Sequence, residues 1–322
     1  MISVKNLTKI FGYKTAVDDL SFEVESGEIL GFLGPNGAGK TTTMRILTGF
    51  FPPTSGSASV NGVDVSEDSM KVREMVGYLP EHVPLYKEMT TREFLGFAAS
   101  AKRLRGTARS EAVERTIERC NLQSVADQLI ATLSRGYRQR VGLGQAIIND
   151  PKVLILDEPT VGLDPTQVRD IRALLRKLGK DSTVILSSHI LSEVQQMCNR
   201  VVIIANGRMQ AMDTPENLTG NMKGEARVSL RIAGAENEEV QAKLNALDRV
   251  DRVEVVSGGN FSVISKSQDR GLAPEIANLV VGAGWELHEL KTHTANLEDI
   301  FIQLVGTEKG LKGETDAVDS EA

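Results

Sequence analysis

Ten consecutive residues set the architecture of this chain: Leu33-Gly34-Pro35-Asn36-Gly37-Ala38-Gly39-Lys40-Thr41-Thr42. They contain the complete pattern G-x-x-x-x-G-K-[ST] of a phosphate-binding loop. An apolar run that predicts a strand, Glu28–Leu33, leads into the loop, and Thr43–Leu47 predicts a helix after it. Strand, loop and helix in this order are the context that the pattern requires, so the stretch predicts a P-loop domain of the α/β class.

The composition of the loop favours an anion as its ligand. Its glycines let consecutive backbone N–H groups converge on one point, and the following helix adds the positive end of its dipole. Lys40 is expected to reach the β and γ phosphates of a nucleotide, Thr41 to ligate Mg²⁺, and Thr42 to reach a phosphate oxygen. The candidate nucleotide-binding residues of the loop are Gly34, Pro35, Asn36, Gly37, Ala38, Gly39, Lys40, Thr41 and Thr42. A glycine-rich turn without a ligand is the alternative, and the full match in context disfavours it.

Composition and charge are those of a globular protein with two domains. The chain has 322 residues, of which 41% are hydrophobic and 25% charged, so each domain is large enough to bury its own core. A net charge of −6 gives no sign of a nucleic-acid surface. The two cysteines, Cys120 and Cys198, lie far apart, which argues against a disulfide framework and against a zinc site.

Neither a membrane span nor a signal peptide is visible in the sequence. No window approaches the roughly 18 apolar residues that cross a bilayer, and Met1–Lys5 lacks a signal-peptide pattern. A membrane role therefore requires a partner.

A second group of candidate residues lies beyond two further apolar runs. Val153–Leu156 is typical of a strand buried on both faces of a parallel sheet, and it ends in Asp157 and Glu158. Ligands of α/β proteins bind at this end of the strands, and neighbouring buried carboxylates are costly without a cation. Thr183–Ser187 predicts a neighbouring strand with His189 just past its end, where a catalytic role is favoured over a structural one.

Antiparallel strands are predicted at the start of the chain. Ile2–Leu7 and Leu20–Val24 alternate apolar and polar residues. Phe11 lies in the loop between them and is a candidate either to stack on an aromatic base or to join the core. Asn-Gly turns predict hairpins over Ser57–Val65 and Arg200–Met212.

A helical insertion is predicted over residues 84–132, where the pattern becomes polar and helical. One of its helices is expected over Glu111–Cys120. Leu133–Tyr137 predicts a turn, followed by an apolar helix over Val141–Ile148, and Gln167–Leu178 predicts an amphipathic helix.

A second, smaller domain is predicted over residues 223–305. Its element order is β-α-β-β-α-β, which is the ferredoxin-like order of an α+β domain. Phe261 and Trp285 are expected in its core, and a short helix is expected over Leu297–Val305. The polar tail, residues 306–322, predicts disorder.

These ordered motifs resemble those of the ATP-binding cassette (ABC) family, the nucleotide-hydrolysing subunits of ABC transporters, over residues 1–220. The correspondences are the Walker A loop at Gly34–Thr41, the signature at Leu133–Tyr137, Walker B at Val153–Asp157 with its catalytic glutamate at Glu158, the D-loop at Gly162–Asp164, the switch histidine at His189 and the base-stacking aromatic at Phe11. The C-terminal extension and the sequence Tyr78-Leu79-Pro80-Glu81 resemble the bacterial drug-export and gliding-motility branch.

The chain departs from the family pattern at two points. In the signature Leu-Ser-Gly-Gly-Gln, Arg135 and Tyr137 replace a glycine and the glutamine, whereas Ser134 and Gly136 are kept. Glu81 replaces the glutamine that in relatives ligates Mg²⁺ and senses the transmembrane partner. A carboxylate binds the metal more strongly but adds negative charge beside the Walker B acids.

The resemblance implies an ATPase that uses ATP and Mg²⁺. The implied roles are metal ligation by Thr41, Asp157 and Glu81, general base catalysis by Glu158, positioning of the γ-phosphate and the water by His189, contact from a second copy by Ser134 and Gly136, and an interface position for Asp164. ATP would then be held between two head-to-tail copies, whose closure drives the partner.

The expected function is the ATP-hydrolysing subunit of a split exporter, bound to the cytoplasmic face of the membrane through a separate polytopic permease. Docking of the permease is expected near Glu81–Phe97. The alternative is a soluble ABC-type ATPase acting on nucleic acid or ribosomes, but tandem cassettes and basic extensions are lacking. A non-hydrolysing regulatory cassette is disfavoured by Glu158 and His189, and a dimer brace or regulator is the expectation for residues 223–305.

Overall fold

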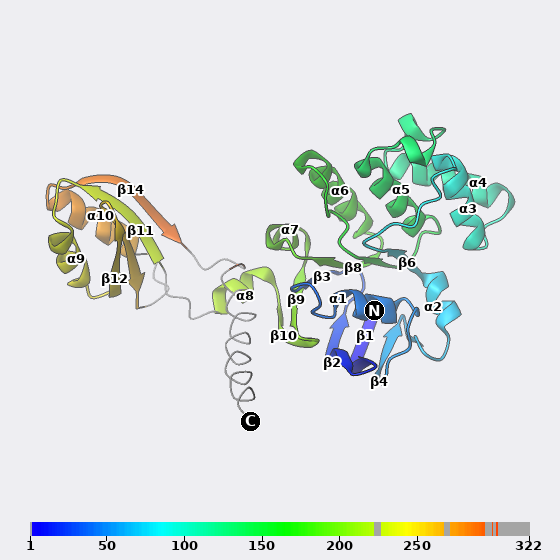
Figure 1. Ribbon diagram of the computed structural model, residues 1–322, viewed down its shortest axis with the longest axis horizontal. Coiled ribbons are helices and arrows are strands. Elements are labelled where there is room, and N and C mark those ends of the chain that lie inside the picture. The colour runs from blue at the N-terminus through cyan, green and yellow to red at the C-terminus, as the bar shows by residue number, and fades with distance from the viewer. Residues whose placement is uncertain (1, 222–226, 267–270, 294–297, 299–300, 302–322) are drawn as a thin grey trace, which may run out of the picture. The chain divides into compact units, whose positions relative to one another are not determined.

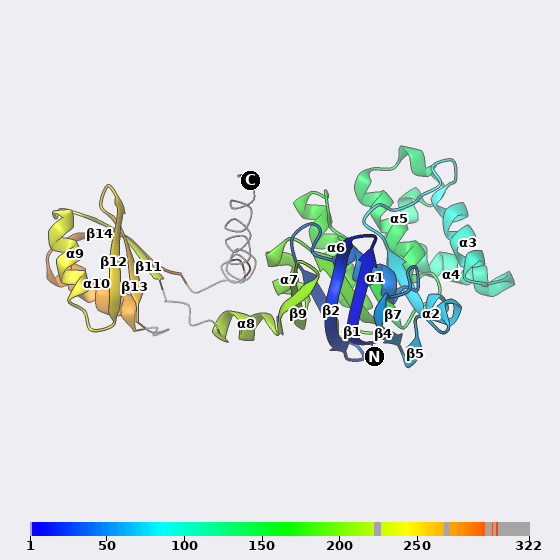
Figure 2. The same cartoon turned by 60° about the horizontal axis from the view of Figure 1, so that its bottom comes forward.

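The computed structural model describes residues 2–221, 227–266 and 271–293, together with 298 and 301. The chain divides between Pro215 and Glu216 into two compact units, a few residues before the boundary expected from the sequence. Figures 1 and 2 show both units. Apart from Glu298 and Phe301, the expected helix over Leu297–Val305 falls outside the described residues, as does the expected tail.

A six-stranded, mostly parallel sheet is the centre of the first unit, in the order β10-β9-β3-β8-β7-β6. Its strands are β3 (Ile29–Leu33), β6 (Val76–Leu79), β7 (Val153–Leu156), β8 (Thr183–Ser188), β9 (Arg200–Ala205) and β10 (Arg208–Asp213). All residues of β7 and β8 are buried, as their continuous apolar runs predict. Strands β3, β7 and β8 are parallel, so the loops at their carboxyl ends meet along one edge.

An antiparallel sheet packs against this core, in the order β2-β1-β4-β5. It consists of β1 (Ile2–Phe11), β2 (Lys14–Val24), β4 (Ser55–Val60) and β5 (Val63–Asp64). Helix α1 (Lys40–Leu47) contributes Met44, Ile46 and Leu47 to the same apolar cluster as residues of both sheets. The helix that follows the phosphate loop is therefore held between the two sheets (Figure 2).

Helices α3, α4 and α5 form the lobe at the upper right of Figure 1. The bounds of these three helices are Thr91–Ala101 for α3, Gly106–Arg119 for α4 and Arg135–Ile147 for α5. The other α-helices in this part of the chain are α2 (Ser69–Met75), α6 (Pro165–Leu178) and α7 (Leu191–Met197), and α8 (Pro215–Asn221) follows β10. Within the described part of the chain, every helix is too short or too polar to span a bilayer.

Two predicted boundaries in this lobe are wrong. Helix α4 begins at Gly106, five residues before the expected start at Glu111. The expected turn over Leu133–Tyr137 is instead the start of α5, whose first residue is Arg135. The reason is Ser134, which caps the helix: its Oγ accepts the Tyr137 N–H at 3.4 Å.

The second unit has the predicted β-α-β-β-α-β order. Its elements are β11 (Arg227–Ala233), α9 (Asn237–Asn245), β12 (Val250–Ser257), β13 (Asn260–Ser265), α10 (Leu272–Gly282) and β14 (Glu286–His293). In the sheet order β12-β13-β11-β14, strand β13 lies between β12 and β11, and β14 lies at the edge beside β11. Phe261 is buried in its apolar core, and Trp285 packs against that core from the side.

Candidate active site

The phosphate loop connects β3 to α1 and depends on glycine where other parts of the chain approach it. Gly37 and Gly39 adopt left-handed φ values of 82° and 105°. A Cβ atom on Gly39 would lie 2.6 Å from the Ala16 carbonyl oxygen, and one on Gly34 would lie 2.4 Å from the Ile204 carbonyl oxygen. The loop is therefore fixed between β2 and β9, with the N-terminus of α1 at its end.

A cavity of about 420 Å³ lies over this loop. Its lining residues are Lys14, Ala16, Asn36, Gly37, Ala38, Gly39, Lys40, Thr41, Thr42, Glu81, Glu158, Val161 and His189. Most of the predicted site residues, from four separate segments of the chain, thus share one cavity. Lys14, Ala16 and Val161 were not predicted. The sequence did contain a sign that Lys14 belongs to the site: this cation follows the Gly12-Tyr13 turn, directly after the candidate residue Phe11.

Lys40 lies in the wall of the cavity with its ammonium group held by the loop. Its Nζ donates to the carbonyl oxygens of Gly34 at 2.7 Å and Pro35 at 3.2 Å, and it lies 3.9 Å from Glu158 Oε1. Burial lowers the pKa of Lys40, and the neighbouring carboxylates, first among them Glu158, oppose this lowering. A phosphate in the cavity would provide the anion that a buried ammonium requires.

Asp157 presents an oxygen that fits a metal ion. The carboxylate is buried, and its Oδ1 accepts a hydrogen bond of 2.6 Å from Ser187 Oγ. The other oxygen, Oδ2, is buried without a hydrogen-bond partner. Because an unpaired buried carboxylate oxygen is costly, a cation is its natural partner. Mg²⁺ prefers oxygen ligands. Thr41, whose hydroxyl is the other expected ligand from the loop, lines the cavity.

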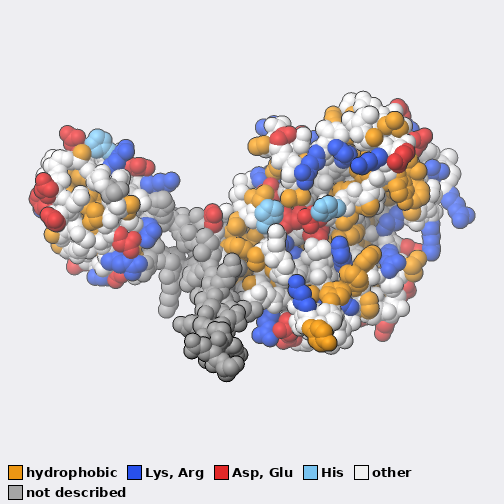
Figure 3. Space-filling view, viewed as in Figure 1, with side chains coloured by type: hydrophobic (Ala, Val, Ile, Leu, Met, Phe, Trp, Pro, Cys, Tyr) orange, Lys and Arg blue, Asp and Glu red, His pale blue; other side chains and the backbone are white. Residues whose placement is uncertain are grey.

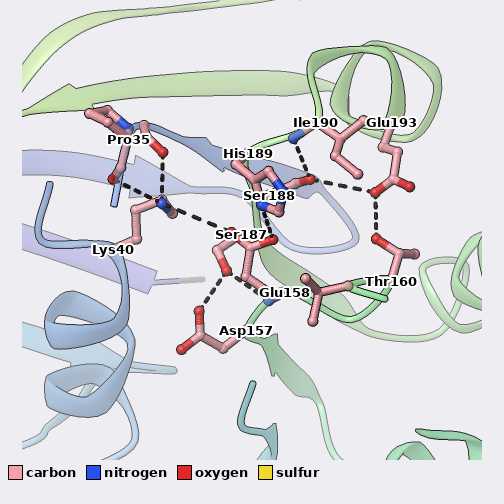
Figure 4. A network of polar contacts seen from close by, with 12 residues as sticks. Pro35, Lys40, Asp157, Glu158, Thr160, Ser187, Ser188, His189, Ile190 and Glu193 are labelled. Atoms are coloured by element: carbon pink, nitrogen blue, oxygen red, sulfur yellow. Dashed lines mark hydrogen bonds and ion pairs between the residues drawn. The ribbon is translucent and has the colours of Figure 1, made fainter. Parts of the chain in front are cut away.

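Glu158 and His189 form a direct pair at the carboxyl ends of β7 and β8 (Figure 4). His189 Nδ1 lies 2.8 Å from Glu158 Oε2. Glu158 has a positive φ of 49°, which is uncommon for a residue with a side chain. Its backbone N–H donates to Ser187 Oγ at 2.8 Å. Ser187 therefore holds both acids at once, a role that the sequence analysis missed although Ser187 is two residues from His189.

Charged side chains gather on one face of the first unit. In Figure 3, histidine side chains lie on either side of acidic side chains on the face of the first unit turned to the viewer. Glu81 is exposed and lines the same cavity as Glu158 and His189. Ligation of a metal ion by Glu81 stays a prediction.

Seven predicted site residues are not among those that line the cavity: Phe11, Gly34, Pro35, Ser134, Gly136, Asp157 and Asp164. The Phe11 ring is 42% exposed and meets Phe51 edge to face at 5.4 Å between centroids. Asp164 caps α6, since its Oδ1 accepts the N–H groups of Thr166 at 3.0 Å and Gln167 at 2.9 Å. Ser134 caps α5, as described above.

Both replaced residues of the signature have partners within the chain. Arg135 donates from Nη2 to the Val161 carbonyl oxygen at 3.1 Å. Its guanidinium lies over Gly162, where an added Cβ would be 2.2 Å from Arg135 Cζ. Tyr137 Oη lies 3.4 Å from Ser124 Oγ. Arg135 thus ties the start of α5 to the loop that leaves the cavity at Val161.

The site combines a glycine-rich loop at a helix N-terminus with a buried lysine, an aspartate that has an unpaired oxygen, and a glutamate-histidine pair. Together these features define a P-loop nucleotide hydrolase. Comparison with known proteins narrows this class. Residues 17–161 match the family model described as ABC transporter.

Relatives of nearly the same length are named as ATP-binding proteins of drug resistance or transport. The chain is 32% identical over 308 residues to the linearmycin resistance ATP-binding protein LnrL of Bacillus subtilis, covering 95% of this chain and 98% of that one. It is also 32% identical over 308 residues to the bacitracin transport ATP-binding protein BcrA of Bacillus licheniformis, covering 95% and 97%. The chain belongs to the ABC transporter family, as an ATP-binding subunit.

A solved structure shows the same fold. The dimeric, post-hydrolysis structure of the ATP-binding cassette MJ0796 with ADP and Pi superposes with a TM-score of 0.62 at 24% identity, covering 66% of this chain and 98% of that one. This structure confirms the expected P-loop fold. Membership of the family confirms the expected use of ATP with Mg²⁺ and the expected ATPase activity. The nucleic-acid alternative is not favoured by any of these relatives.

Proposed function

We propose that this chain is the ATP-hydrolysing subunit of an exporter, that it works as a head-to-tail homodimer, and that it is held at the cytoplasmic face of the membrane by a separate transmembrane partner. The observation that carries the proposal is the shared cavity of Lys40, Thr41, Glu158 and His189 in a chain related throughout its length to subunits named for bacitracin transport and linearmycin resistance.

Neutralisation of the phosphates is the first task of the site. Lys40 and the loop residues line one cavity at the N-terminus of α1. The ammonium group, the loop N–H groups and the positive end of the helix dipole would offset the phosphate charge there. When bound, Mg²⁺ would neutralise and orient the β and γ phosphates, with Thr41 and Asp157 as its protein ligands and Glu81 as a further candidate.

Activation of the water is the second task. Glu158 is the proposed general base, because its carboxylate lines the cavity next to the loop. With Nδ1 of His189 on that carboxylate at 2.8 Å, the ring leaves Nε2 to contact the γ-phosphate. The pair thereby orients the attacking water in line with the leaving group, and the proton of the water passes to Glu158.

A second copy would complete the site. Ser134 and Gly136 lie at the N-terminus of α5 and line no part of the cavity in their own chain. Helix N-termini carry N–H groups that suit an anion. We assign them to the γ-phosphate bound by the other copy, with Asp164 near the interface and Phe11 stacking on the adenine.

The docking surface for the membrane partner is a groove of about 800 Å³ between the parallel sheet and the helical lobe. Its apolar wall includes Tyr86, Phe94 and Phe97. The centroid of the Tyr86 ring lies 6.0 Å from that of Phe94 and 5.2 Å from that of Phe97. Pro80 and His82, on either side of Glu81, also line it. The groove thus adjoins the segment that reaches the nucleotide cavity, which supports coupling of docking to hydrolysis.

Glu158→Gln tests the proposal. The amide keeps the size of the side chain but takes up no proton, so kcat is expected to fall by about 100-fold or more. ATP with Mg²⁺ should still bind, and the trapped complex should have the mass of a dimer in light scattering. The control is Glu118→Gln on the exposed face of α4, which should hydrolyse ATP like the wild type. Monomeric Glu158→Gln that retains no nucleotide would contradict the proposal.

A further inference from the structure

A buried carboxylate lies behind the Glu158–His189 pair (Figure 4). Glu193 is in the first turn of α7, and its side chain is only 3% exposed. It lines no part of the nucleotide cavity and belongs to none of the motifs recognised in the sequence. A buried carboxylate needs specific partners to offset its loss of hydration, so its contacts indicate what it is held for.

One oxygen of Glu193 ties together the two segments that carry the catalytic pair. Oε2 accepts a hydrogen bond of 2.5 Å from Thr160 Oγ1, two residues after Glu158. The same oxygen accepts one of 3.4 Å from Ser188 Oγ, the residue before His189. Ser188 Oγ in turn accepts the N–H of Ile190 at 3.0 Å. His189 therefore lies inside a short turn that is fixed on both sides.

The other oxygen of Glu193 anchors the network to α6. Oε1 lies 3.5 Å from Arg172 Nη2, and Arg172 Nη1 donates to Gln196 Oε1 at 2.7 Å. Glu193 lies on α7, which packs on β3 and β8 of the parallel sheet, and is held by Arg172 from α6. This rigid support is what a side chain needs if it is to set the position of two loops.

Glu158 needs such support because of its backbone. A non-glycine residue at a φ of 49° keeps that conformation only where its surroundings over-determine it. Ser187 holds the N–H of Glu158 from one side. The contact between Glu193 and Thr160 holds the chain directly after Glu158 from the other side.

We infer that Glu193 and Thr160 are positioning residues, which keep Glu158 and His189 in the relative placement that hydrolysis requires. The inference rests on the catalytic roles proposed above for Glu158 and His189. Neither positioning residue touches the nucleotide cavity, so their loss should lower the rate of the chemical step and leave ATP binding in place.

The test uses the full chain with MgATP and compares two substitutions of one residue. Thr160→Val keeps the shape but loses the hydroxyl, whereas Thr160→Ser keeps the hydroxyl. Thr160→Val is expected to lower kcat by about 10- to 100-fold, as small misplacements of catalytic groups do, with KM for ATP unchanged. Thr160→Ser should restore most of kcat. Glu193→Gln, which keeps one acceptor oxygen but loses the charge that faces Arg172, should also lower kcat at unchanged KM.

Glu158→Gln is measured in parallel to separate two kinds of failure. If Glu158→Gln hydrolyses ATP normally, the proposed catalytic role is wrong. If Glu158→Gln is inactive while Thr160→Val retains the kcat of the wild type, only the positioning role is overturned. A Thr160→Val protein with a lower melting temperature and a normal kcat would likewise show that the contact serves stability alone.

Discussion

Ser187 shows how much one small side chain does at this site. Its hydroxyl donates to Asp157 Oδ1 at 2.6 Å and accepts the N–H of Glu158 at 2.8 Å. The residue is fully buried at the end of β8, so water cannot replace either contact. One hydroxyl therefore fixes the proposed metal ligand and the proposed general base together.

Ser187→Ala is expected to destabilise the first unit by about 2 to 6 kcal/mol, because each of two buried polar groups left unpaired costs about 1–3 kcal/mol. Urea unfolding followed by circular dichroism measures the change. The matched control is Ser182→Ala, since this buried hydroxyl makes one hydrogen bond of 2.7 Å, to the Pro151 carbonyl oxygen. Equal losses for the two variants would contradict the double role of Ser187.

At the scale of elements, α3 links the helical lobe to the groove. A capping box at Thr90 and Glu93 fixes the start of α3, so the helix presents its aromatic residues in a defined direction. Phe94 is 2% exposed and belongs to the core of the lobe, whereas Tyr86 and Phe97 are 48% and 45% exposed. The exposed pair, and not Phe94, is the part of this cluster available to a partner.

The double variant Tyr86→Ser/Phe97→Ser is expected to lose most of the ATPase stimulation by the membrane partner. Removal of two aromatic anchors from an interface costs on the order of 2 kcal/mol or more, which is about 30-fold in affinity. Basal ATPase activity of the isolated chain should stay within about twofold, because neither ring lines the nucleotide cavity. Copurification with membranes and stimulated ATPase activity are the measurements. Val281→Ser, an exposed apolar residue of the second unit, is the control; full stimulation in the double variant would refute the docking surface.

At the scale of the whole molecule, each of the two units has a hydrophobic core of its own among the described residues. One includes residues of both sheets and α1, and the other consists of residues from Val228 to Leu290. Ligand binding stabilises only the part of a protein whose fold it requires. The nucleotide cavity belongs entirely to the first unit.

Unfolding in urea is therefore expected in two steps, of which ATP shifts only one. In Glu158→Gln, ATP at 100 times its Kd should stabilise the first unit by about 2.7 kcal/mol. The single tryptophan of the chain, Trp285, packs on the second core and reports that unit alone. Its fluorescence transition should not move with ATP, while the circular dichroism transition of the first unit does. A tryptophan transition that follows the ATP concentration would show that the two units unfold together.

Local patterns were sufficient for the phosphate loop, the Walker B strand and the βαββαβ order of the second unit. These features depend on contiguous residues: glycines that free the backbone, aliphatic runs that fill a buried strand, and alternation that suits a half-buried one. The start of α5 was predicted wrongly, because Gly136 makes Leu133–Tyr137 look like a turn. The N-cap at Ser134 sets the true start of the helix.

Contacts between distant segments could not be predicted in this way. Ser187 meets Asp157 across 30 residues, and Thr160 meets Glu193 across 33. Nothing in the spacing of these residues indicates the pairing, which follows from the parallel alignment of β7 and β8 and from the packing of α7 on β3 and β8. The chemistry of the loop was thus readable from its own residues, whereas the residues that hold Glu158 and His189 in place became visible only when folding brought the strand ends together.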